Sequence, residues 1–296
     1  MSGMLNISIS KKAGQLGRIV RHSAMARRTG RTHRPVLAAD GQMGVTFIGH
    51  SSFFLQTSSA NVVVDPIFAQ WLFVLKRLRR PGLRVHDLPP LDAVLVTHAH
   101  FDHLHRPSLR ALARATKLKL GRAPLLIVPN NCGDLVFDLG FERVVELSWW
   151  QEFQLGETRI TATPARHWGA RVIRDMHRGF GGYVLDDGHH SIYHSGDTAY
   201  FNGFAEIGQR LHPRVALLPI GAYHPESFRA VHTSPEDALR GFVEMEADCM
   251  IPMHFGTFKL SQEPVDEPVK RLLAGARKLG IESRVRVLEE GVAEFF

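Results

Sequence analysis

The sequence predicts an α/β protein in which two β-sheets are flanked by helices. Short apolar runs alternate with helical stretches, a second set of the same kind follows the first, and no obvious linker separates them. The 296-residue chain is 44% hydrophobic and 22% charged, which excludes a disordered chain, a collagen-like repeat and a coiled coil. We therefore expect one domain over residues 44–296, preceded by a partly ordered arm over residues 1–43.

The first predicted strands lie close together in the sequence. Three short apolar runs separated by turn residues are Val45–Ile48, Phe53–Gln56 and Asn61–Val64. A fourth run, Ala93–Val96, ends at a polar threonine and predicts a buried strand that leads into a loop. Pro107 suits the first turn of a helix, so a helix is expected from Ser108 to about Thr116.

The second set of elements follows the same pattern. Asp186-Asp187-Gly188 lies between two apolar runs and predicts a β-hairpin. Ser234-Pro235-Glu236-Asp237 predicts the start of a helix, because it combines an N-cap residue with an acidic first turn. The further predicted strands are Pro124–Val128, Arg143–Leu147, Thr158–Thr163, Gly182–Leu185, Ser191–His194, Val215–Ile220, Cys249–Met253 and Val285–Leu288.

The net charge of +7 belongs to the arm. Eight of the 36 basic residues lie in residues 1–39, which contain no acidic residue, so the rest carries 28 basic against 29 acidic residues. This arm is interpreted either as a solvated, partly ordered extension or as an organelle transit peptide. It lacks the apolar region of a secretory signal, and no apolar window is long enough to span a bilayer, so we expect a cytoplasmic protein.

A second basic stretch, Pro66–His86, combines large apolar residues with positive charges. One interpretation is an ordinary basic loop over a hydrophobic core. The other is a lipid-facing element that gives access to the substrate and associates peripherally with a membrane. The residues assigned to that role are Trp71, Phe73, Lys76, Arg77, Arg79 and Arg80.

The strongest motif is Thr97-His98-Ala99-His100-Phe101-Asp102-His103, which directly follows a predicted buried strand. Imidazole nitrogens and carboxylate oxygens are suitable ligands for Zn²⁺, and the two cysteines of the chain cannot form a Cys-rich site. One zinc ion cannot use all four side chains and keep an open position. Two ions can, provided that other loops supply further ligands.

Three other loops supply further candidate ligands, each at the end of a predicted strand. His167 follows Thr158–Thr163, Asp197 follows Ser191–His194, and His254 follows Cys249–Met253. Loops at strand ends are where a rigid scaffold commonly carries chemically active residues. The sequence therefore predicts a metal centre assembled from four loops.

This combination of loops resembles the metallo-β-lactamase fold superfamily. Within it, the chain is most similar to the N-acylphosphatidylethanolamine-hydrolysing phospholipase D family and its bacterial relatives. The resemblance covers about residues 44–265 and implies a four-layer αββα sandwich. Besides the four loops, the matching motifs include Gly49-His50-Ser51-Ser52, Asp65-Pro66, Pro219-Ile220-Gly221-Ala222-Tyr223 and His254-Phe255-Gly256-Thr257-Phe258.

The resemblance also implies two zinc ions per chain. One would be held by His98, His100 and His167, and the other by Asp102, His103 and His254. Asp197 would bridge both, and a metal-bound hydroxide would attack the substrate. Asp102 is expected to orient that hydroxide, and His232 is expected to be catalytic. The residues expected to support the ligands or to contact substrate are His50, Asp65, Tyr223 and His224.

The leading hypothesis is a phosphodiesterase of phospholipase D type acting on N-acylphosphatidylethanolamine-like phospholipids. The alternative is a soluble metal-dependent hydrolase of a lactone or a small phosphorylated metabolite. A hypothesis of another class is a catalytically inactive metal-binding module, which the complete set of seven ligands disfavours. Nucleic acid is not an expected partner, because the body of the chain is neutral, and no oligomeric state is predicted.

Overall fold

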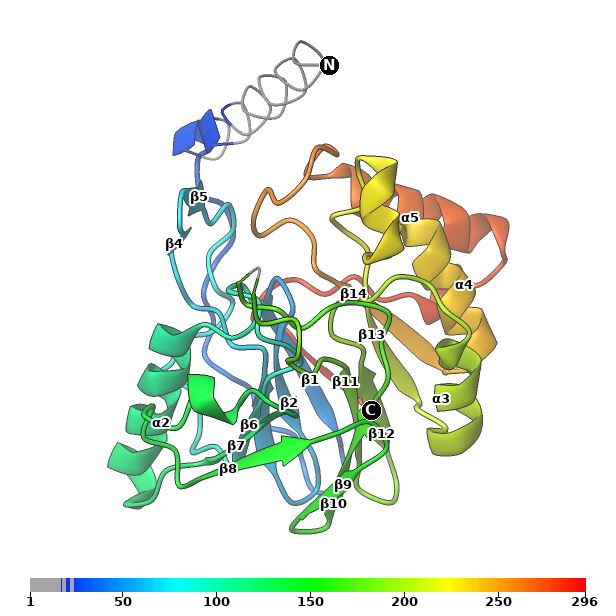
Figure 1. Ribbon diagram of the computed structural model, residues 1–296. Coiled ribbons are helices and arrows are strands. Elements are labelled where there is room, and N and C mark those ends of the chain that lie inside the picture. Colours follow the sequence, from blue (N-terminus) through cyan, green and yellow to red (C-terminus); the bar gives the residue numbers. More distant parts are fainter. Residues whose placement is uncertain (1–16, 18–19, 22–23, 173) are drawn as a thin grey trace.

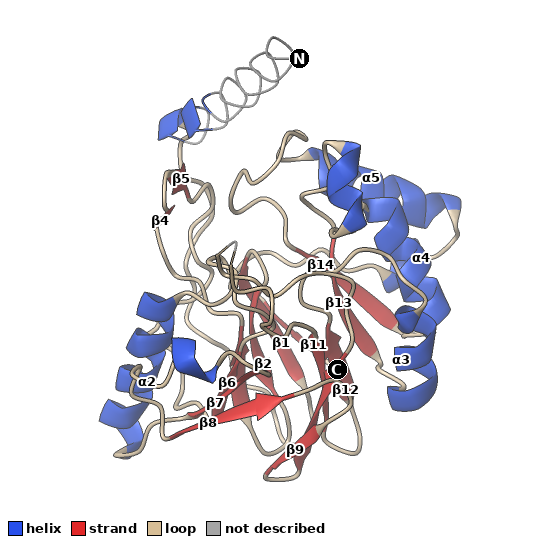
Figure 2. Ribbon diagram, in the orientation of Figure 1, coloured by secondary structure: helices blue, strands red, loops and turns tan. Residues whose placement is uncertain are grey.

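The computed structural model describes residues 17, 20–21, 24–172 and 174–296. The rest of the predicted basic arm, residues 1–16, 18–19 and 22–23, lies outside the described residues. Two β-sheets pack face to face, and helices cover both outer surfaces (Figure 1). The helices, the strands and the long loops above them are distinguished in Figure 2. The predicted four-layer α/β/β/α arrangement is confirmed.

Seven strands form the first sheet in the described part of the chain. Their spatial order is β15 (Ala293–Phe295), β1 (Gly44–Gly49), β2 (Ser52–Gln56), β3 (Asn61–Val64), β6 (Ala93–Leu95), β7 (Leu125–Pro129) and β8 (Arg143–Leu147). The pairs from β15 to β3 are antiparallel, and those from β3 to β8 are parallel. Helix α2 (Arg106–Leu120) connects β6 to β7 and packs on the outer face.

Six described strands form the second sheet. Their order is β14 (Cys249–Met253), β13 (Val215–Pro219), β12 (Ser191–His194), β11 (Gly182–Asp186), β10 (Thr158–Thr163) and β9 (Glu152–Leu155). Strands β11 and β12 form the predicted antiparallel hairpin. The outer face is covered by α3 (Gly203–Leu211), α4 (Pro235–Met245) and α5 (Glu267–Lys278).

Alternation along the strands produces the two-sided packing. In β3, Val62 and Val64 enter the core between the sheets, whereas Val63 packs under α2. In β13, Val215 and Leu217 likewise point between the sheets, and Ala216 and Leu218 pack under the helices. Successive side chains of a strand point to opposite faces, so strands that are apolar at every position are buried on both sides.

Helix boundaries follow local capping. The ring of His105 accepts a hydrogen bond from Ser108 N, and Pro107 occupies the first turn of α2. Ser234 caps α4 in the same way through Asp237 N. Helices α3 and α5 were not expected from the sequence. Among the described helices, none is both long and apolar enough to cross a bilayer.

The prediction of a strand over Val285–Leu288 is wrong. Val285 forms a single bridge with Met250, and Arg286 N donates to Met250 O, but the chain then leaves that edge. A turn at Glu289 follows, and the backbone N of Gly291 donates to the carbonyl oxygen of Phe47. This turn directs the last strand, β15, to the edge of β1 instead.

A small hairpin, β4 (Trp71–Leu72) and β5 (Leu75–Lys76), extends from the first sheet. Figure 1 shows it beside the N-terminal segment. Thr29 N donates to Leu78 O, and Arg80 N donates to Thr29 O, so the described end of the arm pairs with the segment that follows the hairpin.

Candidate metal centre

The four predicted loops meet at one edge of the sandwich. Strands β12, β13 and β14 are parallel, and β10 runs in the same direction as β12 because both are antiparallel to β11. Their carboxyl ends therefore lie at the same edge, where the loop after β6 also ends. The structure brings all seven predicted ligands together: His98, His100, Asp102, His103, His167, Asp197 and His254.

Three imidazoles form one side of the cluster. His98 Nε2 lies 2.8 Å from His100 Nδ1, which lies 3.2 Å from His167 Nε2. Burial lowers the pKa of His98 well below its usual value and that of His167 to about 3. All three rings therefore offer a neutral nitrogen lone pair at neutral pH, which is the form that binds a metal.

The other side contains a carboxylate and three imidazoles. The Oδ2 atom of Asp102 lies 3.8 Å from His103 Nε2 and 3.8 Å from His254 Nε2. It also lies 2.9 Å from Nε2 of His50. His50 is thus part of the cluster itself, and its contact holds one oxygen of Asp102 in place.

Asp197 connects the two sides, because it forms one group with His98 of the first side and His103 of the second. Its Oδ2 atom is 3.3 Å from His103 Nε2 and 3.1 Å from His254 Nε2. Burial by itself lowers the pKa of His254, but the carboxylates of Asp197 and Asp102 outweigh it and raise that pKa to about 9. The pocket therefore stabilises positive charge despite being buried.

Hydrogen bonds around the cluster orient its rings. Asp65 accepts from Thr97 N at 2.7 Å and from Thr97 Oγ1 at 2.6 Å, and its Oδ2 atom lies 2.7 Å from His103 Nδ1. His167 Nδ1 lies 2.8 Å from the carbonyl oxygen of Val231. The contacts of His103 with Asp65 and of His167 with Val231 O place a proton on Nδ1 of each ring. They turn Nε2 of each ring into the cluster, as hydrogen-bond partners of metal-binding histidines commonly do.

The cluster has the properties of a metal site. Among the described residues, His103 Nε2, His254 Nε2 and Asp197 Oδ1 are buried and form no hydrogen bond. Buried polar atoms nearly always have a partner. A cation between these convergent nitrogen and oxygen atoms would supply that partner, and the donor set suits zinc.

A cavity of about 400 Å³ opens above the cluster. Its floor is polar and contains His100, Asp102, Asp197, His232 and His254. Its walls are apolar and are formed by Leu72, Phe73, Val74, Leu75, Phe101, Trp168, Phe228 and Leu260. The size and the apolar lining are typical of a small-molecule site.

His232 lies at the boundary between floor and wall. Its Nδ1 atom is 3.7 Å from Asp197 Oδ2, and burial lowers its pKa to about 4, so the ring is neutral at neutral pH. Sequence reasoning missed several wall residues. Trp168 follows the predicted ligand His167 directly and could have been included, whereas no local pattern marks Phe228 or Leu260.

Tyr223 and His224 do not line this cavity. The hydroxyl of Tyr223 donates to Glu267 Oε1 at 2.7 Å, which turns the ring toward α5. Both residues line a neighbouring cavity with Glu226 and Arg229. The expectation that they support the ligands or contact substrate therefore stays a prediction, and neither side chain lines the cavity above the cluster.

The four basic residues assigned to the lipid-facing element are not arranged as expected. Arg77 is completely buried and hydrogen-bonds to backbone carbonyls. Arg79 donates to Glu290 Oε2 at 2.6 Å, and Arg80 donates to Gly30 O. Lys76 donates to Ala26 O at 2.8 Å. These contacts direct the positive charges toward the protein and its arm.

The apolar residues of the same element are exposed. Trp71 and Phe73 are 48% and 70% exposed, and Val74 is 53% exposed. Phe73 packs edge-on against Phe101 with ring centroids 4.7 Å apart, so the exposed hairpin tip continues into the cavity wall.

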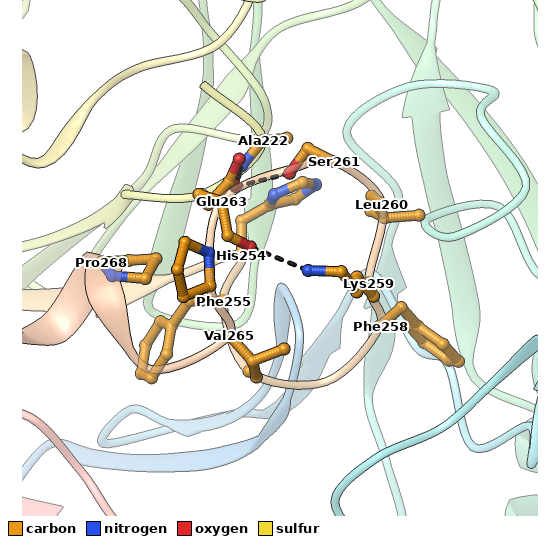
Figure 3. Close-up of a pocket in the computed structure, with 13 residues that line it drawn as sticks. Ala222, His254, Phe255, Phe258, Lys259, Leu260, Ser261, Glu263, Val265 and Pro268 are labelled. Atoms are coloured by element: carbon orange, nitrogen blue, oxygen red, sulfur yellow. Dashed lines mark hydrogen bonds between the residues drawn. The ribbon is translucent and has the colours of Figure 1, made fainter. Parts of the chain in front are cut away.

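A small cavity on the other side of the His254 loop shows how that loop is held (Figure 3). The buried carboxylate of Glu263 accepts hydrogen bonds from Ala222 N at 2.7 Å and from the hydroxyl of Ser261. Lys259 Nζ donates to the carbonyl oxygen of Glu263 at 3.0 Å. The segment after β14 is therefore braced against the segment after β13.

A four-layer α/β/β/α sandwich with a His/Asp cluster at one strand edge is the arrangement of the metallo-β-lactamase fold. Comparison with known proteins agrees. Residues 60–255 match the family model described as "Beta-lactamase superfamily domain". The chain therefore belongs to the beta-lactamase superfamily and has the metallo-β-lactamase fold.

Among the relatives is the mitochondrial N-acyl-phosphatidylethanolamine-hydrolyzing phospholipase D of Saccharomyces cerevisiae, 31% identical over 265 residues. That alignment covers 85% of this chain but spans only 55% of the yeast protein. A UPF0173 metal-dependent hydrolase of Methanopyrus kandleri is 28% identical over 84% of this chain and 98% of its own length. The solved isothiocyanate hydrolase from Delia radicum gut bacteria has the same fold, with a TM-score of 0.69, 21% identity, and coverage of 86% of this chain and 99% of that chain.

Proposed function

We propose that this chain is a dinuclear zinc-dependent phosphodiesterase that hydrolyses N-acylphosphatidylethanolamine-like phospholipids in the manner of a phospholipase D. The observation that carries the proposal is the cavity, whose floor is a cluster of metal-binding side chains and whose walls are apolar. The name of the yeast relative supports the same substrate class.

The donor atoms divide into two sets joined by Asp197, which supports two ions instead of one. Two zinc ions would polarise the phosphoryl oxygen and lower the pKa of a bound water. Asp102, held by His50, would orient the attacking water from the floor of the cavity. His232 is neutral and faces the cavity, so one ring nitrogen is available to donate a hydrogen bond to a phosphoryl oxygen.

The apolar walls would hold acyl chains. The hairpin tip carries Trp71, Phe73 and Val74 into solvent next to the cavity mouth. Large apolar side chains in such a position suit insertion into a lipid surface. We therefore include in the proposal that the hairpin tip contacts the bilayer from which the substrate is taken, and that the protein associates peripherally with membranes.

The test begins with elemental analysis of the purified chain, which should find close to two zinc ions. The chain is then assayed on N-acylphosphatidylethanolamine vesicles, on lactones and on bis(p-nitrophenyl) phosphate, with chelator-treated protein as the control. Hydrolysis of the vesicles with release of the N-acylethanolamine is the expected result, and chelation should abolish it.

Other outcomes lead to the rival hypotheses. Turnover of lactones without turnover of either phosphodiester would replace the proposal with the soluble hydrolase. Zinc binding without turnover of any substrate would favour an inactive metal-binding module. A single tightly bound ion, with no activation by added zinc, would overturn the dinuclear centre.

A further inference from the structure

Arg77 is a buried cation outside the metal centre. Its side chain is completely buried, and its three guanidinium nitrogens each donate to a backbone carbonyl. Nη1 donates to Ile67 O at 2.8 Å, Nε to Arg79 O at 2.8 Å, and Nη2 to Ile48 O at 3.3 Å. One side chain thereby joins three separate segments of the backbone.

No carboxylate lies within ion-pair distance of this guanidinium among the described residues. Burial lowers the pKa of Arg77 to about 9, so the group still carries its charge at neutral pH. Buried charges are normally paired, because their desolvation is costly. The guanidinium is also tightly packed, since a Cβ added to Gly49 would lie 2.5 Å from Nη2 of Arg77.

Two of the segments that Arg77 joins lead to residues that contact the cluster. Ile48 precedes His50 by two residues, and Ile67 follows Asp65 by two. The guanidinium also lies 5.6 Å from the ring of Phe258, which packs edge-on against His50 with centroids 5.6 Å apart.

Backbone contacts reinforce this connection. Leu78 N donates to Thr257 O, the hydroxyl of Thr257 accepts from His50 N at 2.7 Å, and His254 N donates to His50 O at 2.8 Å. The segment of Arg77 and the loops of His50 and His254 therefore form one hydrogen-bonded unit.

This unit contacts mainly one side of the cluster. His50 contacts Asp102, Asp65 contacts His103, and His254 is itself a candidate ligand of the Asp102 side. The unit reaches the other side through Asp65 and Thr97, whose Oγ1 lies 3.0 Å from His98 Nδ1. The ring of His167 is held instead by Val231 O, and the ring of His100 contacts other members of its own side and Trp168. Among the described residues, Arg77 hydrogen-bonds to neither His100 nor His167.

From this asymmetry we propose that Arg77 is a positioning residue for the second metal subsite, the one formed by Asp102, His103 and His254. The guanidinium fixes the segments of Ile48 and Ile67, which lead to His50 and Asp65, and the backbone of its own segment bonds to the loop of His254. The subsite of His98, His100 and His167 depends on it less. The inference rests on the proposed two-metal centre.

The experiment compares full-length Arg77→Met and Arg77→Lys with the wild type. Arg80→Met is the matched control, because Arg80 lies on the same segment and is exposed. Each protein is stripped with a chelator and titrated with Zn²⁺ by calorimetry, after circular dichroism has shown that it is folded. The wild type and Arg80→Met should bind two ions.

In Arg77→Met, one ion should bind as in the wild type, and affinity for the other should fall on the order of 10–100-fold, as when an outer support of a metal ligand is lost. In Arg77→Lys, the affinity for this second ion should lie between those of the wild type and Arg77→Met, because an ammonium group cannot reach all three carbonyls. If Arg77→Met does not fold, the lysine variant decides the question by the same criterion.

Two unchanged affinities in the folded Arg77 variant would overturn the role of Arg77 and leave the two-metal centre standing. Equal weakening of both ions would also overturn it, because a general structural role predicts that result. A wild type that binds one ion would overturn the two-metal centre, and the inference about Arg77 with it.

Discussion

The floor and the mouth of the cavity differ in how their side chains are held. On the floor, Asp197 is buried and lies within 3.3 Å of two imidazoles, and Asp102 contacts three. At the mouth, Phe73 is largely exposed, and among the described residues its ring contacts the ring of Phe101 only. The floor is therefore rigid and electrostatically coupled, whereas the mouth is an apolar surface with few constraints.

We therefore expect the floor to carry out the chemistry and the mouth to control access of a lipid substrate. Any substrate must use the floor, because the metal-binding atoms lie there, whereas only a substrate embedded in a lipid surface needs the mouth. Variants of the floor should reduce activity on every substrate, and variants of the mouth should reduce activity on vesicles alone.

The largest effect is expected for Asp197→Asn. The change removes a negative charge from between the two sides of the cluster, so zinc content and turnover should both fall. The loss should exceed the roughly 10–100-fold typical of residues that only support a ligand. It should be the same for vesicles and for bis(p-nitrophenyl) phosphate, as measured by kcat/KM and elemental analysis.

Asp186→Asn is the matched control for this variant. Asp186 is paired with Arg159 at 2.6 Å on the β10–β11 side of the second sheet and does not line the cavity. It should keep full activity and full zinc content. Normal turnover and zinc content in Asp197→Asn would show that the ligand set is wrongly assigned.

A smaller effect is expected for His232→Gln, which tests the boundary between floor and mouth. Loss of a hydrogen bond to a charged phosphoryl group costs about 1.5 kcal/mol, roughly tenfold in kcat. Zinc content should not change, because His232 is not assigned as a ligand. Loss of zinc from this variant would instead place His232 among the metal ligands.

The mouth is tested by the double variant Phe73→Ser, Val74→Ser. Removing two apolar side chains from a lipid contact should weaken vesicle binding about tenfold, given ~25 cal/mol for each Å² of apolar surface. Hydrolysis of vesicles should fall in parallel, and kcat/KM for bis(p-nitrophenyl) phosphate should stay at the wild-type value. Vesicle sedimentation and the two assays measure this.

Phe137→Ser is the matched control, because Phe137 is 76% exposed and does not line the cavity. It should leave vesicle binding unchanged. An equal loss on both substrates in the double variant would show that the hairpin tip is structural. No loss on either would remove the membrane from the proposal.

The same contrast explains what could be predicted from the sequence. The four ligand-bearing loops could be predicted because each follows a strand and strand ends are fixed by the sheet, and the resemblance then indicated the seven ligand positions within them. The burial of Arg77 could not be foreseen, because its carbonyl partners come from segments that only the folded chain brings together. Without those contacts, Arg77 is indistinguishable from exposed Arg80.

Helix α3 shows the same limit for the fold. Its sequence contains Gly203 and Gly208, which weaken a local helix prediction. A Cβ on Gly208 would lie 2.2 Å from the carbonyl oxygen of Met245, so glycine is needed there for close packing against the end of α4. The reason for that residue lies in a tertiary contact, whereas strands such as β3 were confirmed because a short run of β-branched residues between turn residues is a local signal.

The smallest effects are expected at the two cysteines, which belong to neither the floor nor the mouth. Cys132 is completely buried, and burial raises the pKa of its thiol to about 12, so at pH 8 the thiolate fraction is on the order of one in ten thousand. Native protein should therefore react with iodoacetamide far more slowly than denatured protein, as followed by mass spectrometry. Cys132→Ser and Cys249→Ser should retain wild-type kcat on both substrates. Rapid labelling of the native chain with loss of turnover would mean that a thiol takes part in the chemistry, and the separation of a metal-binding floor from an apolar mouth would then be incomplete.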